Sequence, residues 1–317
     1  MDIEYLLRLQ EFRNATGDML TPFLEGISLF AVTYLVMVPA FIYWGLDKKK
    51  GLFTMFTYSF CCAVNAVVKL CVCAYRPWIR DSRVMPAGDS ITTATGYSFP
   101  SGHTSTAGAV YGGIAVTNWK DRRWISAVAA VAFLLTAFSR NYLGVHTPQD
   151  VAVATVIALI SLYVTSGYMK LTESDPKKED IFLLLGVILG FAAIAFITFK
   201  PYPMDYVEGR LLVDPQKMMN DGYGDISKII AFCIARYVEK KWIRFEPAGM
   251  NGRGAALCAV GLVGLWAIIR FIGSPLYALL GDHWGHFAKD AIRVFYIVAL
   301  YPAIIKLFSG KGRASAE

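Results

Sequence analysis

The chain has 317 residues, of which 56% are hydrophobic and only 17% are charged, and its formal net charge is +7 at pH 7. With a mean hydropathy of +0.45, it is too apolar for an ordinary water-soluble domain, and the composition predicts an integral membrane protein. The positive charge is not gathered into a basic groove with interleaved aromatic residues, which argues against a nucleic-acid partner.

The apolar residues form nine runs, and a helix needs about 20 residues to cross the roughly 30 Å of hydrocarbon in a bilayer. We therefore predict an all-α fold, a polytopic membrane bundle of about nine transmembrane helices. The seventh is the least apolar, because Lys228 and Arg236 interrupt it. A short amphipathic helix is expected at the membrane interface before the first of them. The predicted spans are residues 22–44, 51–74, 101–118, 124–140, 148–169, 181–199, 222–241, 254–274 and 286–308.

Lysine and arginine residues collect in alternate loops between these spans. Because short cytoplasmic loops carry the excess of positive charge, the pattern predicts an N-out, C-in orientation. The loops 75–100, 140–147, 200–221 and 281–286 then lie on the extracytoplasmic face. The charges predicted to be cytoplasmic are in residues 45–51, 120–123 and 239–244, and at Lys177, Lys178, Lys311 and Arg313.

Five charged or titratable side chains stand at the outer ends of the second, fourth and fifth predicted spans. A cation at such a depth is costly, so it indicates a function unless it snorkels to the interface. Because several cations meet on one face, we expect them to bind an anion, and the planar arginine side chain matches phosphate oxygens in pairs. The five are Lys69, Arg76, Arg140, His146 and Asp150.

The sequence Pro100-Ser101-Gly102-His103 opens the third predicted helix on the same face. The first N–H groups of a helix and the positive end of its dipole form an anion site. Gly102 lets the backbone approach a ligand closely. Taken alone, the stretch also fits a helix start with a serine cap and an exposed histidine.

His146 and Asp150 are four residues apart, about one helical turn. At that spacing the carboxylate is able to hold one imidazole nitrogen and leave the other free as a nucleophile. The alternative is that Asp150 only caps a helix that begins at Thr147 and Pro148. Two histidines with different neighbours, His103 and His146, indicate two roles, attack and proton transfer.

Together these residues resemble the type-2 phosphatidic-acid phosphatase superfamily, which includes lipid phosphate phosphatases, undecaprenyl-pyrophosphate phosphatases and glucose-6-phosphatases. Its motif Lys-x6-Arg-Pro corresponds to residues 69–77, Pro-Ser-Gly-His to 100–103, and Ser-Arg-x5-His-x3-Asp to 139–150. The resemblance divides the chain into an interfacial segment 1–21, a catalytic transmembrane core 22–170, and additional transmembrane helices of the same domain in 171–317.

The resemblance implies a metal-independent phosphatase without a cofactor. His146 would attack phosphorus to give a phosphohistidine, Asp150 would orient it, and His103 would protonate the leaving oxygen. The non-bridging oxygens would be bound by Lys69, Arg76, Ser101, Gly102 and Arg140.

The substrate is expected to be a lipid phosphate, of the phosphatidic acid or polyprenyl pyrophosphate type, that enters from the bilayer. A soluble sugar phosphate is the alternative, followed by a lipid phosphotransferase and an anion transporter. We expect the cell membrane as the location, with the active site facing outside the cytoplasm, and the sequence leaves the oligomeric state open.

Two outer loops complete the prediction. Loop 79–99 is rich in Gly, Ser and Thr, and it reads as a mobile lid whose Arg80 and Arg83 touch the substrate, or as a plain solvated loop. Residues 281–286 read as an interfacial loop anchored by Trp284 or, less simply, as a metal site of His283 and His286.

Overall fold

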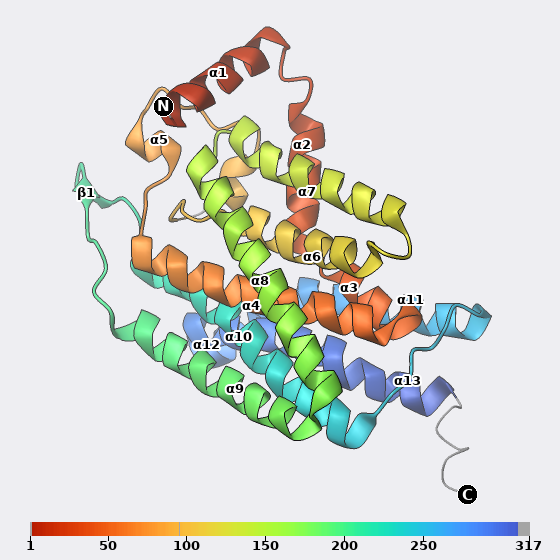
Figure 1. Ribbon diagram of the computed structural model, residues 1–317. Helices are drawn as coiled ribbons and strands as arrows, with labels where there is room; N and C mark the ends of the chain where they lie inside the picture. Colours follow the sequence, from red (N-terminus) through yellow and green to blue (C-terminus); the bar gives the residue numbers. More distant parts are fainter. Residues whose placement is uncertain (1, 95, 310–317) are drawn as a thin grey trace, which may run out of the picture.

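The computed structural model describes residues 2–94 and 96–309, and over these its regular secondary structure is helical except for one short hairpin (Figure 1). Thr95 in the predicted lid, and Lys311 and Arg313 in the tail, lie outside the described residues. The helix α1 lies beside α5 at one end of the molecule (Figure 1).

The helices follow one another along the chain and are joined by connecting segments. The α-helices are α1 (Asp2–Ala15), α2 (Thr21–Thr33), α3 (Met37–Phe41), α4 (Lys48–Val72), α5 (Pro77–Arg80), α6 (Gly102–Asn118), α7 (Arg123–Tyr142), α8 (Pro148–Ser174), α9 (Pro176–Phe199), α10 (Pro215–Val238), α11 (Gly252–Phe271), α12 (Gly273–Phe295) and α13 (Tyr301–Ser309). Tighter or wider helical turns form η1 (Ile42–Leu46), η2 (Ser90–Thr93), η3 (Glu239–Ile243) and η4 (Tyr296–Leu300). The hairpin pairs β1 (Tyr206–Val207) antiparallel to β2 (Arg210–Leu211).

Within the described residues, six helical stretches are long and apolar enough to cross a membrane, which indicates a multi-pass helical membrane protein. A seventh is formed if α2 is joined to the stretch 37–46, from which it is bent by 53°. The predicted spans 101–118 and 222–241 are the helices α6 and α10, and neither is among the six. The count of nine and the N-out, C-in orientation therefore stay predictions.

Two predicted elements differ from the structure, one by a break within a span and one by a helix where a loop was expected. The first predicted span is broken after Thr33, and the chain turns before it resumes a helix at Met37. The loop expected at 281–286 is helical and belongs to α12, which bends at Gly281, a residue with φ 74° and ψ 173°. Glycine adopts this backbone conformation without the strain that a side chain would bring.

The helix α4 is the centre of the bundle, and it packs against α6, α8 and α10. The helix α10 is in turn enclosed by α4, α9 and α12. This enclosure explains the low hydropathy of the seventh predicted span, because its charges meet buried partners. Lys228 is paired with Asp225 and Asp290, and Arg236 with Glu179 and Glu239.

Small residues bring α6 close to α8. A Cβ atom on Gly108 would stand 2.7 Å from Ala158 Cβ, and one on Gly112 would stand 2.7 Å from Leu162 Cδ1. Real Cβ contacts are longer, so larger residues would push the helices apart. The helix that begins at residue 102 is thus held directly against the helix that begins at residue 148.

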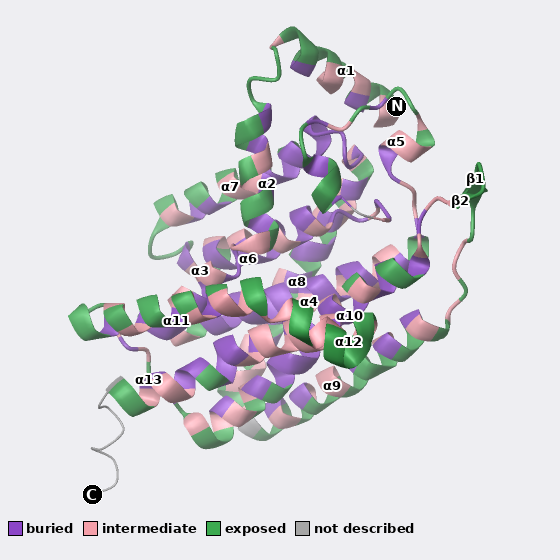
Figure 2. Ribbon diagram, turned by 180° about the vertical axis from the view of Figure 1, so that it is seen from behind, coloured by how far each residue is buried: buried purple, intermediate pink, exposed green. Residues whose placement is uncertain are grey.

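Exposed apolar side chains mark the outside of the bundle. On α9 the large side chains of Leu184, Ile188, Leu189 and Phe199 are all more than half exposed, whereas α4 and α10 are mostly buried (Figure 2). A face of this kind matches hydrocarbon as its solvent.

Candidate active site

The turn between α7 and α8 holds His146 rigidly. The carbonyl oxygen of Arg140 accepts hydrogen bonds from the N–H groups of Val145 and His146, each at 3.2 Å. The side-chain amide of Asn141 donates to the carbonyl of His146 at 2.9 Å. The imidazole is 1% exposed, so its position is fixed by buried contacts from both sides.

The carboxylate of Asp150 combines the two roles that the sequence left open. Its Oδ2 accepts a hydrogen bond from the Thr147 backbone at 2.8 Å, while Thr147 Oγ1 accepts one from the Asp150 backbone at 3.3 Å, which makes a capping box. The same Oδ2 lies 3.3 Å from His146 Nδ1. Asp150 therefore caps α8 and also orients the imidazole.

Ser98 completes this arrangement and was missed in the sequence. Its hydroxyl donates to Asp150 Oδ2 at 2.5 Å and lies 3.4 Å from His146 Nδ1, and the residue is 2% exposed. The only sequence signal is its place two residues before Pro100, in the stretch that opens the third predicted helix.

Replacing Ser98 by alanine is expected to lower kcat about tenfold with little change in KM, since the loss of one buried hydrogen bond costs on the order of 1 kcal/mol. Steady-state kinetics on purified protein check this. The matched control is Ser90→Ala, a buried serine whose hydroxyl bonds to the carbonyl of Ala87. An equal loss in both variants would mean that Ser98 acts on stability alone.

The other imidazole nitrogen of His146 faces a cation. Its Nε2 lies 2.9 Å from Arg76 Nη1, and Arg76 also donates to the carbonyls of Val145 at 2.9 Å and Gly96 at 3.1 Å. Because a guanidinium only donates, Nε2 accepts and the proton resides on Nδ1. The lone pair expected of a nucleophile is thus directed at a group predicted to bind phosphate.

The charge state of His146 follows from its surroundings. Burial, together with the positive charges of Arg76, Arg140 and Lys69, lowers the pKa of His146 well below its ordinary value. The imidazole is therefore neutral at neutral pH, as a nucleophile must be.

Modification by diethyl pyrocarbonate tests the charge state of His146, because this reagent acylates an imidazole only in its neutral form. We expect the pH midpoint for modification of His146, followed by peptide mass spectrometry, to lie below the ordinary value of about 6.5. The unfolded chain would bind a proton there that the folded chain does not, so His146 favours unfolding increasingly as the pH falls below that value. A midpoint at or above 6.5 would contradict the neutral assignment.

Lys69 and Ser101 join the motifs to one another. Lys69 Nζ donates to the carbonyl of Pro100 at 2.5 Å and to those of Tyr97 and Ser98 at 3.3 Å. The backbone N–H of Ser101 donates to the carbonyl of Asp150 at 3.1 Å, and its hydroxyl caps α6 by accepting from the Thr104 backbone at 3.3 Å. Both residues thus fix the loop before α6 in addition to their predicted part in phosphate binding.

A cavity of about 180 Å³ opens in front of these groups, and it is lined by Lys69, Arg76, Gly102, His103 and His146. A Cβ on Gly102 would meet nothing nearer than Asn65 Oδ1 at 4.0 Å, so the start of α6 is open to the cavity. His103 is 6% exposed, and among the described residues its Nε2 has no hydrogen-bond partner. Such a buried polar atom is expected to meet a ligand.

Arg140 is not brought into this cavity. Its fully buried side chain donates to Ser28 Oγ and lines a neighbouring hollow, which shares Thr93 with the cavity of the histidines. Its Nε and Nη2 atoms have no hydrogen-bond partner within the part of the chain described. The positive charge of Arg140 contributes, after burial and Arg76, to lowering the pKa of His146.

The predicted lid is held by α1. Arg80 pairs with Asp2 at 2.8 Å and Arg83 with Glu4 at 3.2 Å. Arg13 donates to the carbonyl of Met85 at 2.8 Å. The two arginines offered as substrate contacts therefore face the amino-terminal helix, which clamps the loop.

The histidines of α12 differ from each other in position. His286 lines the cavity, whereas His283 bonds to Gln216 at 3.1 Å and stacks on Tyr223 at 5.1 Å. Trp284 packs against Tyr223, with 5.3 Å between ring centroids. The two imidazoles thus have different surroundings, and only His286 joins the candidate active site.

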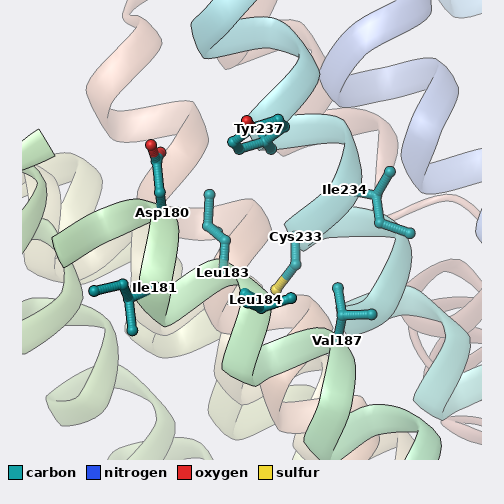
Figure 3. Close-up of a pocket in the computed structure, with 8 residues that line it drawn as sticks. All are labelled: Asp180, Ile181, Leu183, Leu184, Val187, Cys233, Ile234 and Tyr237. Atoms are coloured by element: carbon teal, nitrogen blue, oxygen red, sulfur yellow. The ribbon is translucent and has the colours of Figure 1, made fainter. Parts of the chain in front are cut away.

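A third hollow, of about 400 Å³, lies between α9 and α10 (Figure 3). Its walls are almost entirely apolar, and they include Leu183, Leu184 and Cys233. The carboxylate at its edge, Asp180, is bound by Lys240 at 2.7 Å. It shares no lining residue with the cavity of the histidines, so it is not the candidate active site.

Comparison with known proteins agrees with the motifs. Residues 49–172 match the PAP2 superfamily, and this segment includes all three motifs. Phosphatidylglycerophosphatase B of Bacillus subtilis (strain 168) is 27% identical over 150 residues, which cover 45% of this chain and 70% of that protein. No solved structure matches the chain significantly. The chain therefore carries, in residues 49–172, a domain of the type-2 phosphatidic acid phosphatase superfamily.

Proposed function

We propose that this protein is an integral-membrane phosphatase that hydrolyses the phosphate monoester or pyrophosphate of a lipid through a phosphohistidine. The observation that carries the proposal is the pair of contacts at His146, with Asp150 on Nδ1 and Arg76 on Nε2. A nucleophile oriented by a carboxylate and aimed at a phosphate-binding cation suits attack on phosphorus.

In the first step the phosphate displaces Arg76 from direct contact with His146, and the Nε2 lone pair forms a bond to phosphorus. The bond from phosphorus to the alcohol oxygen breaks, and that oxygen takes the proton that His103 acquires when the negatively charged phosphate binds beside it. Asp150 and Ser98 stabilise the positive charge on the imidazole through Nδ1. Lys69, Arg76, the backbone at Ser101 and Gly102, and the field of Arg140 stabilise the phosphate oxygens.

In the second step water attacks the phosphorus of the phosphohistidine. His103, now neutral, accepts a proton from the water as the bond from phosphorus to Nε2 breaks. Inorganic phosphate leaves, and both histidines return to their starting state. Neither step requires a metal, because the cations supply the positive charge.

A lipid substrate is supported by two observations. The relative from Bacillus subtilis is named as a phosphatase of a phospholipid, and the catalytic residues stand at the ends of apolar helices. We place the protein in the cell membrane, with the site on the extracytoplasmic face, on the strength of the charge pattern of its loops.

Phosphate release by the purified protein in detergent, with EDTA present, tests this function. We expect release from phosphatidic acid, phosphatidylglycerol phosphate or undecaprenyl pyrophosphate, and none from glucose 6-phosphate. Release from the sugar phosphate alone would identify a soluble substrate. No release from any of them would reject the proposed function, and activity that EDTA abolishes would reject metal independence.

A further inference from the structure

The cavity of the histidines has a second wall, which the family motifs do not supply. It is formed by Asp221 and Asp225 of α10 and by His286, Lys289 and Asp290 of α12, and we refer to these five residues as the far wall. All five lie outside the segment 49–172 that matches the superfamily. The catalytic groups therefore face side chains that are particular to the carboxyl-terminal half of this chain.

Two carboxylates of the far wall, those of Asp225 and Asp290, are paired with cations. Lys228, which is 7% exposed, bonds to Asp225 and lies 3.6 Å from Asp290 Oδ2. Arg293 lies 3.0 Å from Asp290 Oδ1. Of these pairs, the one between Lys228 and Asp290 joins α10 to α12.

Asp221 differs from both of them. Its side chain is exposed, and within residues 2–94 and 96–309 it makes neither a hydrogen bond nor an ion pair. It nevertheless lies within electrostatic range of Lys69, His286 and Lys289. A carboxylate only accepts hydrogen bonds, so Asp221 offers the cavity a free acceptor.

His286 adds a second acceptor beside it. Its Nδ1 lies 2.8 Å from the carbonyl of Asp282, which can only accept, so Nδ1 donates and the neutral ring keeps its lone pair on Nε2. The ring stacks on Tyr277, with 4.5 Å between centroids, and Tyr277 Oη also holds the ammonium of Lys289 at 2.8 Å. The far wall thus presents two acceptors, and Tyr277 occupies one of the three donors of its lysine.

The charges on the two walls orient a substrate. A carboxylate repels phosphate, so the phosphoryl group belongs beside Lys69 and Arg76 and the uncharged part of the headgroup belongs beside Asp221. A volume of about 180 Å³ is below the roughly 300–1,000 Å³ of sites for drug-sized ligands. It suits a phosphate with a few carbons and excludes long chains.

On the basis of the proposed function, we propose that Asp221 and His286 select lipid phosphates whose leaving alcohol carries a free hydroxyl group. The hydroxyl donates to the far wall, and the phosphoryl group is held at the motif wall by Lys69 and Arg76. The lipid chains remain outside the cavity. Asp221 is a specificity residue in this arrangement, and it takes no part in proton transfer.

The test uses three lipids with the same acyl chains and a terminal phosphate on a three-carbon headgroup. In one the headgroup carries a free hydroxyl, in the second a hydrogen replaces it, and in the third an amino group does. Wild-type protein is expected to prefer the hydroxyl lipid over the hydrogen analogue by about tenfold in kcat/KM, the value of one good hydrogen bond. Asp221→Asn and Asp221→Ala should lose most of this preference. The value of kcat/KM should fall for the hydroxyl lipid and stay unchanged for the hydrogen analogue.

The control is Asp282→Asn, which removes the same charge as Asp221→Asn but from an exposed carboxylate of α12 that lies outside the cavity. This variant should keep the preference for the hydroxyl lipid. Equal hydrolysis of the hydroxyl and hydrogen lipids by the wild type would overturn the inference and leave the phosphatase function intact. A loss in Asp221→Asn that is equal on both lipids would also overturn it. Better hydrolysis of the amino lipid than of the hydroxyl lipid would overturn the inference, because the far wall would then select a cation. No release from any lipid would reject the proposed function itself.

Discussion

Replacing His146 by alanine is expected to reduce phosphate release by roughly four orders of magnitude or more, because covalent catalysis stops when the nucleophile is removed. The contacts of Asp150 with Ser98 and Thr147 do not involve the imidazole, so the capping box of α8 should persist in the variant. Initial rates of phosphate release from a lipid phosphate in detergent measure the effect.

The matched control for this variant is His283→Ala. His283 belongs to α12 and bonds to Gln216, and it does not line the cavity. It should retain wild-type activity, and size-exclusion profiles should show that both variants are folded. Wild-type rates in folded His146→Ala would reject the mechanism.

Replacing His103 by asparagine is expected to lower kcat by roughly 10²–10⁴-fold on a lipid phosphate, whose alkoxide leaves poorly without a proton. The loss should be much smaller for an aryl phosphate such as p-nitrophenyl phosphate, because its leaving group needs no acid. His103 is buried and its Nε2 is unpartnered among the described residues, so the substitution breaks no hydrogen bond of that atom.

The comparison between the two leaving groups separates acid catalysis from general damage. An equal fall for lipid and aryl substrates would show that His103 acts in binding or in dephosphorylation rather than as the acid. Burst kinetics with the aryl phosphate distinguish these cases, because slow dephosphorylation leaves a rapid first turnover in place.

The long helices were predictable from sequence because uninterrupted apolar runs have few other solutions in a membrane. The predicted spans 51–74, 124–140 and 254–274 correspond to α4, α7 and α11 within a few residues. The break after Thr33 was not predictable, since the residues on both sides of it are apolar. The helix through 281–286 was missed because its polar residues read as a loop, whereas His283 bonds to Gln216 of α10 and His286 lines the cavity.

The candidate site was likewise predictable from the sequence only in part. Capping by Thr147 and the pairing of His146 with Asp150 depend on local spacing, and the sequence predicted both. The far wall depends on how α10 packs against α4 and against α12, and no local pattern encodes these contacts. The same holds for Arg140, whose place at the end of α7 was predicted but whose direction, toward Ser28 on α2, was not.

The central claim is that phosphate passes through a covalent bond to His146. The most direct test mixes purified protein with a lipid phosphate, stops the reaction within the first turnovers under alkaline conditions, and maps the phosphorylated peptide by mass spectrometry. We expect one phosphoryl group on His146 in the wild-type protein and none in His146→Ala. Turnover without a phosphorylated histidine, or a phosphoryl group on any other residue, would contradict it.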